Sequence, residues 1–141
     1  MQAKTLILSA ALLCGFAASG QAAELKGNPA HGAVVFKKCM QCHHIGVGAT
    51  NFYGPVLNGV VGRKAGTVHG YNYSSANKHS GIVWTKKALT VYLAKPQHDV
   101  PKTYMTFKGL KNPQDIADVI AYLSEFSSSG KRTPPHTMKK K

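Results

Sequence analysis

The chain has 141 residues, which is enough for one domain, and its formal net charge is +13. So large a positive charge favours acidic partners. Nucleic acid is not expected among them, because only two of the 18 cationic residues are Arg and the chain begins with a predicted export signal. An anionic membrane surface is expected to make at most a weak contact.

Residues 1–23 predict a secretory signal peptide. Lys4 supplies the positive start, residues 6–18 form an apolar stretch, and residues 20–22 (Gly-Gln-Ala) form a small-x-small site, so cleavage is expected after residue 22 or 23. The apolar stretch is too short to span a bilayer, and an uncleaved membrane anchor is the alternative. Cys14 leaves with the signal, so the mature chain keeps two cysteines.

The first helix of the mature chain is expected to begin at Asn28 and Pro29, an N-cap followed by proline in the first turn. It would run to about Lys38 and deliver Cys39 to the motif that follows. Gly32 on this helix either permits the close approach of another helix or is a tolerated helical glycine.

The central motif is Cys39-Met40-Gln41-Cys42-His43. Two thiols three positions apart, followed directly by an imidazole, have the spacing with which both sulfurs bond covalently to the vinyl groups of a haem while the histidine binds the iron. The alternatives are a redox Cys-x-x-Cys and half of a zinc site, but neither a strand-rich frame nor a second cysteine pair accompanies the motif. The sequence predicts one haem c, bound through Cys39 and Cys42. With the export signal and no disulfide, it favours a bacterial periplasm.

Residues 44–73 are rich in glycine and lack sustained periodicity, so they are predicted to be loop. So long a loop is expected only where it has a special purpose. Here it would wrap a flat cofactor, with Pro55, Leu57 and Val60 against the cofactor surface.

Two further helices are predicted before the next loop. A short one covers residues 74–78, capped by one of its serines, and Thr85 caps a longer one over residues 86–95, which Pro96 stops. Tyr92 lies on the apolar face of the longer helix. Its side chain is either core packing or a hydroxyl of the haem pocket.

The remaining chain is a loop, a helix and a tail. Residues 97–111 form the loop, which contains Met105, and Pro113 opens the most regular helix, whose apolar face would dock across the first helix. The predicted domain covers residues 24–126. Residues 127–141 are basic and are expected to be a disordered tail.

The ligand of the sixth iron position would decide between an electron carrier and a catalyst. Met105 has the reach to approach the haem from the face opposite His43, whereas Met40 lies inside the attachment loop and Met138 in the tail. Histidine ligation stays open, with these candidates: His31, His44, His69, His79, His98 and His136.

Several motifs follow one another in order along the chain. They are Cys39-x-x-Cys42-His43, Gly54-Pro55-x-Leu57-x-Gly59-x-x-Gly62-Arg63-Lys64-x-Gly66, Tyr73-x-x-Ala76-Asn77-Lys78, Gly81-Ile82-x-Trp84, Pro101-x-Thr103-x-Met105-x-Phe107-x-Gly109 and Ala121-Tyr122-Leu123. With them, residues 27–126 resemble a class I cytochrome c, close to mitochondrial cytochrome c and its short bacterial relatives. The resemblance implies an all-α fold in which three main helices, short helices and long loops wrap around one covalently bound haem.

The resemblance also implies roles for the matching residues. His43 and Met105 would bind the iron from opposite sides, with the other ring nitrogen of His43 donating to the Pro55 carbonyl. Three residues would meet the haem propionates: Arg63, Tyr73 and Trp84. Three would form a polar network beside the sulfur: Asn77, Tyr92 and Thr103. Phe107 would cover the haem edge, and Tyr122 would lie where the first and last helices cross.

Three positions depart from the family pattern. Tyr104 stands where the family has a lysine often used in docking, Lys102 replaces a customary glycine, and Asn51 replaces a structural histidine. Of the family's lysine ring around the haem edge, two lysines match and four others lie nearby: Lys38 and Lys111, then Lys37, Lys95, Lys102 and Lys108.

The expected function is electron transfer, not catalysis. The protein would be a soluble periplasmic monomer that docks briefly on acidic faces of redox complexes. These would be a quinol-cytochrome c oxidoreductase or a dehydrogenase on one side, and a terminal oxidase, a reductase or a photosynthetic reaction centre on the other. The alternatives are a catalyst or gas sensor with an open sixth position, such as a small peroxidase, and a four-helix-bundle cytochrome, although that type carries its attachment motif near the C-terminus.

Overall fold

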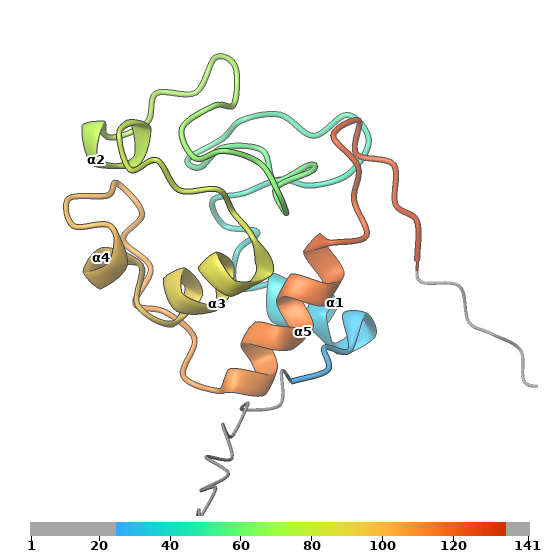
Figure 1. Cartoon of the computed structure of the whole chain (residues 1–141). Helices are drawn as coiled ribbons and strands as arrows, with labels where there is room; N and C mark the ends of the chain where they lie inside the picture. The colour runs from blue at the N-terminus through green and yellow to red at the C-terminus, as the bar shows by residue number, and fades with distance from the viewer. Residues whose placement is uncertain (1–24, 135–141) are drawn as a thin grey trace, which may run out of the picture.

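The computed structural model describes residues 25–134, so the predicted signal peptide and residues 135–141 lie outside it. The described helices are α1 (Pro29–Phe36), α2 (Ser75–Lys78), α3 (Lys86–Ala94), α4 (Pro96–Asp99) and α5 (Pro113–Leu123) (Figure 1). Within residues 25–134, β structure is limited to two isolated bridges. The predicted all-α fold is confirmed. None of the described helices is both long and apolar enough to cross a membrane.

The helices begin where the capping residues predict. Asn28, Ser74 and Thr85 each accept a hydrogen bond from a backbone N–H in the first turn of the helix that follows. Such a bond satisfies a donor that has no partner inside its helix. The structure differs from the prediction at Pro96, which ends α3 as expected but also begins the one-turn helix α4. Proline can do both, because its fixed φ suits the first turn of a helix.

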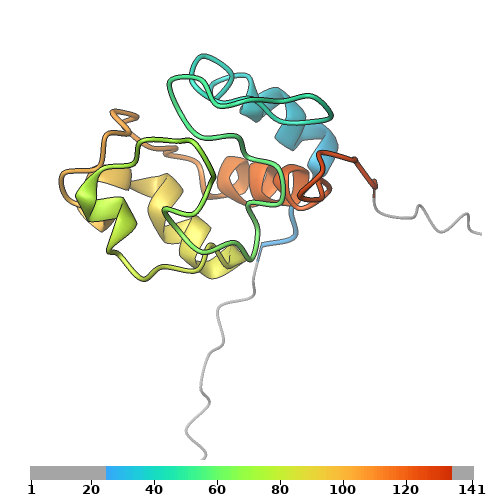
Figure 2. The same cartoon turned by 90° about the horizontal axis from the view of Figure 1, so that it is seen from above.

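The first and last helices pack closely against each other (Figure 2). A Cβ on Gly32 of α1 would overlap the backbone carbonyl of Asp118 in α5 and lie 2.8 Å from the Cβ of Tyr122. Of the two interpretations of Gly32, the structure supports the first: the glycine permits the close approach of another helix. The Tyr122 ring lies at this crossing, 5.3 Å from the ring of Phe36.

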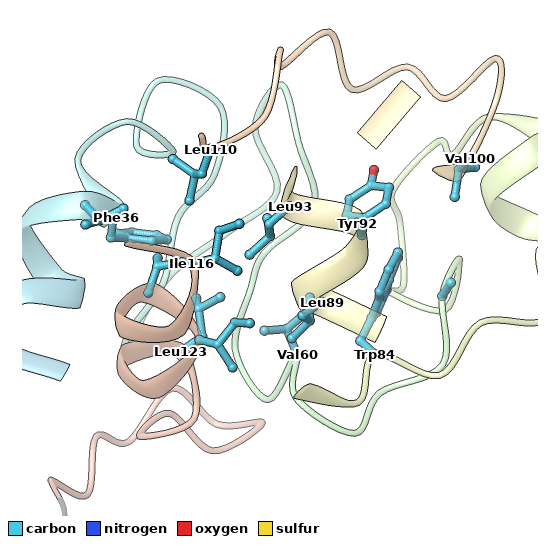
Figure 3. Close-up of a cluster of buried hydrophobic side chains, with 14 residues drawn as sticks. Phe36, Val60, Trp84, Leu89, Tyr92, Leu93, Val100, Leu110, Ile116 and Leu123 are labelled. Atoms are coloured by element: carbon cyan, nitrogen blue, oxygen red, sulfur yellow. The ribbon is translucent and has the colours of Figure 1, made fainter. Parts of the chain in front are cut away.

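The hydrophobic core lies between α1, α3 and α5 and continues into the loops (Figure 3). Its members include Phe36 from α1, Leu89, Tyr92 and Leu93 from α3, Ile116 and Leu123 from α5, and the loop residues Val60, Trp84, Val100 and Leu110. The backbone N–H of Leu110 donates to the Leu93 carbonyl at 2.8 Å, which ties the loop before α5 to α3.

The chain after α5 differs from the prediction. The sequence pattern ends the domain at residue 126, but residues 127–134 fold back on the domain instead of leaving it. The backbone N–H of Thr133 donates to the Glu125 carbonyl at 2.8 Å, and Arg132 Nε donates to Glu125 Oε2 at 2.7 Å. These contacts are made by backbone and charged groups, which leave no apolar periodicity in the sequence.

Candidate haem site

A cavity of about 560 Å³ lies between the helices and the long loops, within the size range of cofactor sites. Its wall contains all twelve residues that the sequence assigns to the site. In the described chain, His43 and Met105 are the only histidine and the only methionine in this wall. The other candidate ligands within residues 25–134 are not part of it, and His136 and Met138 lie outside the described residues.

His43 is held by a bond to the backbone. Its Nδ1 lies 2.7 Å from the Pro55 carbonyl oxygen, so Nδ1 carries the proton and Nε2 keeps a free lone pair. Burial lowers the pKa of His43, as do the charges of Arg63 and His44, while the bond to Pro55 acts in the opposite direction. The imidazole is therefore neutral, the form that binds a metal. Gly54 leaves room for the ring, since a Cβ there would lie 2.7 Å from Nδ1.

The two cysteines lie in a tight turn just after the C-terminus of α1. The backbone N–H groups of Cys42 and His43 both donate to the Cys39 carbonyl, at 3.0 and 2.9 Å. Burial, with a smaller effect of Cys42, raises the pKa of the free Cys39 thiol to about 11. A redox Cys-x-x-Cys needs a thiol whose pKa is lowered, for example by a helix N-terminus. This environment therefore disfavours the redox alternative.

Met105 is surrounded by polar side chains. Tyr92 Oη donates to Met105 Sδ at 3.3 Å, and the backbone N–H of Met105 donates to Thr103 Oγ1, also at 3.3 Å. Asn77 Nδ2 donates to the same hydroxyl at 3.5 Å. Burial raises the pKa of Tyr92, so the phenol stays protonated and remains a donor to the sulfur. The structure thus brings together the polar residues that the sequence places beside Met105.

Arg63 presents an unpaired N–H in the cavity wall. Its Nη1 and Nη2 donate to the carbonyls of Asn58 at 2.7 Å and Val56 at 3.1 Å. Its Nε is buried without a hydrogen-bond partner. A half-buried guanidinium whose Nε has no partner fits an anionic group in the cavity, such as a carboxylate.

The other predicted contacts also lie in the wall. Tyr73 Oη accepts a bond from the Val68 N–H at 3.3 Å and keeps its own proton for another acceptor. The Trp84 ring packs on Tyr92, 4.6 Å between centroids. Apolar surfaces, a neutral imidazole, a thioether and an unmet cationic donor therefore fit a flat apolar cofactor with anionic substituents and a metal at its centre.

Among the residues that the structure adds to the cavity wall are two tyrosines of the glycine-rich loop that the sequence analysis missed. Tyr53 and Tyr71 line the cavity, and Tyr71 Oη donates to the Tyr53 carbonyl at 2.6 Å. Both lie in the glycine-rich loop, where no periodicity marks a side chain as inward-facing.

Asn51 links two segments of the long loop. Its Nδ2 donates to the His69 carbonyl and its Oδ1 accepts from the Val56 N–H, both at 3.0 Å. The amide thus has a donor and an acceptor, as a neutral imidazole has, which explains how it can stand in place of a structural histidine.

The comparisons with known proteins agree with this geometry. Residues 29–127 match the family model "Cytochrome c". The chain is 52% identical over 101 residues to a cytochrome c2 of Rhodoplanes tepidamans, a match that covers 72% of this chain and 94% of that protein. It is 55% identical over 104 residues to a cytochrome c of Theileria annulata, covering 73% and 90%. The solved structure of cytochrome c2 from Rhodospirillum centenum superposes with a TM-score of 0.68 at 41% identity, covering 72% of this chain and 99% of that one.

An all-α chain that encloses a cavity with a Cys-x-x-Cys-His motif in its wall has the architecture of a class I cytochrome c. The chain belongs to the cytochrome c family. Members of this family bind one covalently attached haem c through that motif, and they are electron-transfer proteins, not enzymes. The predictions of class, fold, haem and electron transfer are confirmed. Family membership excludes the zinc, peroxidase and four-helix-bundle alternatives.

Proposed function

We propose that this cytochrome works in a bacterial periplasm as a one-electron carrier whose axial ligands are His43 and Met105. The observation that carries the proposal is that the cavity wall, within the described residues, contains a single histidine and a single methionine. A haem iron supplies the one-electron couple when it is bound there. The chain supplies two ligands, their orientation and a largely apolar enclosure.

Hydrogen bonds prepare both proposed ligands. The Pro55 carbonyl holds His43 in the tautomer that leaves Nε2 free. The Tyr92 hydroxyl bonds to Met105 Sδ and fixes the direction of the sulfur. A thioether is a soft ligand that stabilises ferrous iron, so this pair favours a high midpoint potential. With both of these residues bound, the iron would have no open position for a substrate, as suits a carrier.

Arg63, Tyr73 and Trp84 are proposed to hold the haem propionates. The unpaired Arg63 Nε and the free hydroxyl proton of Tyr73 are the donors that support this role. Carboxylates next to an apolar core need such partners, because an unpaired buried charge is costly. Phe107 lines the same cavity and would cover one edge of the haem.

The proposed partners are acidic faces of redox complexes. They are a quinol-cytochrome c oxidoreductase or a dehydrogenase as donor, and a terminal oxidase, a reductase or a photosynthetic reaction centre as acceptor. The net charge of +13 supports them, as does the exposure of the whole lysine set: Lys37, Lys38, Lys95, Lys102, Lys108 and Lys111. Lys38 also lies 3.6 Å from Asp115, so its charge is partly compensated.

The ligand assignment is tested by Met105→Ala in the haem-loaded protein. We expect the covalent haem to remain, the weak near-infrared band of sulfur-to-iron ligation to disappear, the midpoint potential to fall, and cyanide to bind quickly. Met40→Ala is the matched control, because Met40 is 57% exposed in the attachment loop and should leave all these readouts unchanged. A Met105→Ala protein with its near-infrared band intact would show that another residue binds the iron.

The docking proposal is tested by ionic strength. The rate at which a purified quinol-oxidising complex reduces the cytochrome should fall steeply from low to high salt, because screening weakens the attraction between opposite charges. A rate that stays flat over this range would show that the positive charge has no part in docking.

A further inference from the structure

The chain beyond α5 forms a turn that we call the C-terminal clasp (residues 124–134). At its centre, Arg132 Nε donates to Glu125 Oε2 at 2.7 Å, and the Glu125 side chain is only 4% exposed. The guanidinium also lies over the ring of Tyr122, 5.1 Å from its centroid. A buried carboxylate that loses its cation is strongly destabilised. Removal of the Arg132 charge should therefore open the clasp.

The clasp packs against the loop that follows the haem-attachment motif. Gly130 is buried, and a Cβ there would overlap the Gly46 carbonyl and lie 2.7 Å from Asn58 Nδ2. The backbone N–H of Gly59 donates to the Phe126 carbonyl at 3.2 Å. Figure 1 shows the red end of the described chain beside this blue-green loop. The clasp and the loop thus share an interface with no room for a side chain at Gly130.

Asn58 connects this interface to the cavity. Its Oδ1 accepts from the Gly46 N–H at 2.7 Å, and its Nδ2 donates to the Gly46 carbonyl at 2.9 Å. Its own backbone carbonyl accepts from Arg63 Nη1 at 2.7 Å. One residue therefore contacts the clasp with its side chain and orients the cavity arginine with its backbone.

We propose that the C-terminal clasp is a positioning device for Arg63. The pair of Arg132 and Glu125 holds Gly130 against the loop, and this keeps the Asn58 carbonyl where it fixes the Arg63 guanidinium in the cavity wall. The inference rests on the proposed role of Arg63 beside the haem propionates. A positive charge at that place affects the oxidised and reduced states unequally, so the midpoint potential reports its position.

The test compares Arg132→Gln with Lys131→Gln in the haem-loaded protein. Both changes remove one positive charge, but Lys131 is exposed and takes part in the clasp through its backbone. We expect Arg132→Gln to speed amide hydrogen exchange at Gly46 and Gly59 at least about tenfold. It should also shift the midpoint potential, whereas Lys131→Gln should change neither readout.

A second variant perturbs the same contact without changing charge. Gly130→Ala places a methyl group against the Gly46 carbonyl, at a glycine with a φ of 82°. It should shift the midpoint potential in the same direction as Arg132→Gln. Opposite shifts would mean that the charge, and not the clasp, is what the haem site senses, and this would overturn the inference.

Arg63→Gln separates this inference from the proposed function. If Arg63→Gln shifts the potential and Arg132→Gln matches Lys131→Gln, the clasp has no positioning role, although Arg63 acts as proposed. If neither Arg63→Gln nor Arg132→Gln shifts the potential, the proposed role of Arg63 fails, and the inference fails with it. Unchanged exchange at Gly46 in Arg132→Gln would show that the pair does not hold the loop.

Discussion

The crossing helices α1 and α5, which we call the helical base, are held together differently from the loops that line the cavity (residues 44–73 and 97–111). In the base, α1 and α5 start at capping residues, carry apolar faces and meet at a glycine. The loops are instead held by single polar contacts between segments that are distant in sequence. Asn51 reaches His69 within the long loop, and Tyr92 of α3 reaches Met105 in the loop before α5. The base therefore follows from local sequence, whereas the loops depend on contacts that no local pattern records.

This difference has an energetic consequence. Burial in the base is spread over many side chains, so it is sensitive chiefly to changes of volume at the crossing. Each bridge in the loops is instead one or two hydrogen bonds, and its loss costs on the order of 1 kcal/mol of the free energy of unfolding. A substitution at the helix crossing should therefore change the free energy of unfolding more than a substitution at one of the loop contacts.

The largest effect is expected from Gly32→Val. The new side chain would overlap the Asp118 carbonyl and meet the Cβ of Tyr122, so α1 and α5 must move apart. Overpacking of this kind should lower the free energy of unfolding by about 3 kcal/mol. Ala30→Val is the control, since it adds a valine to the exposed face of the same helix. Urea unfolding followed by far-UV circular dichroism measures both, and equal midpoints would contradict the close crossing.

The sequence predicts the helices well because the signals that begin and end them are local, although it leaves the role of Gly32 open. Caps at Asn28 and Thr85 and the apolar period after Pro113 are local signals, and the structure has helices at each of them. Helix α4 escaped prediction because four residues hold no measurable period. The C-terminal clasp escaped because an ion pair and backbone bonds hold it.

The cavity is a different case. The lack of periodicity in residues 44–73 indicates only that a long loop wraps a flat group. It does not identify the residue that binds the sixth position of the iron. The two cysteines and His43 are predicted from their spacing, whereas residues such as Arg63, Asn77 and Phe107 are predicted only from the order of the family motifs, and the cavity wall contains all twelve predicted residues. Tyr53 and Tyr71 line the cavity too, but they belong to none of these motifs. Long-range hydrogen bonds place these side chains, and such bonds cannot be deduced from neighbours in sequence.

A smaller effect on the base is expected from Asp118→Asn. The Asp118 side chain is 4% exposed and accepts bonds from the Asn28 N–H (2.7 Å), Gln114 Nε2 (2.7 Å) and His31 Nδ1 (2.8 Å). Burial alone would raise the pKa of this carboxyl, but the three hydrogen bonds hold it below the usual value of 3.8. Loss of the charge should cost about 2 kcal/mol at pH 7.

The cost of Asp118→Asn should become smaller as the pH falls. Because the folded-state pKa is lowered, the carboxylate stabilises the fold above about pH 4, and the stabilisation is lost as pH falls through the folded-state pKa. The difference in unfolding free energy between the natural chain and Asp118→Asn should therefore shrink in acid. Asp115→Asn removes a charge that lies 3.6 Å from the exposed Lys38 ammonium and accepts from Asn112 Nδ2 at 3.4 Å, and it should cost under about 1 kcal/mol. A difference that grows below pH 4 would contradict the role of Asp118.

The smallest effect on the free energy of unfolding is expected from a substitution in the loops, Lys102→Gly. Lys102 has a φ of 67°, and it is the only non-glycine residue with positive φ in the described chain. A side chain in this conformation costs roughly 1 kcal/mol, which glycine removes, although the greater freedom of glycine in the unfolded state offsets part of the gain. Lys102→Gly should therefore stabilise the protein by up to about 1 kcal/mol, measured by urea unfolding at high salt so that charge effects are screened.

Lys108→Gly supplies the contrast, because it removes the same charge from the same loop at a residue without positive φ. There the greater freedom of glycine in the unfolded chain should lower stability by a few tenths of a kcal/mol or more. Opposite signs for the two variants would show that the loop conformation is imposed on Lys102 by the rest of the molecule, against its local preference. The same sign for both variants would mean that the 97–111 segment relaxes freely around residue 102. In that case this turn would not share the feature that distinguishes the loops from the helical base, namely a conformation held by distant contacts.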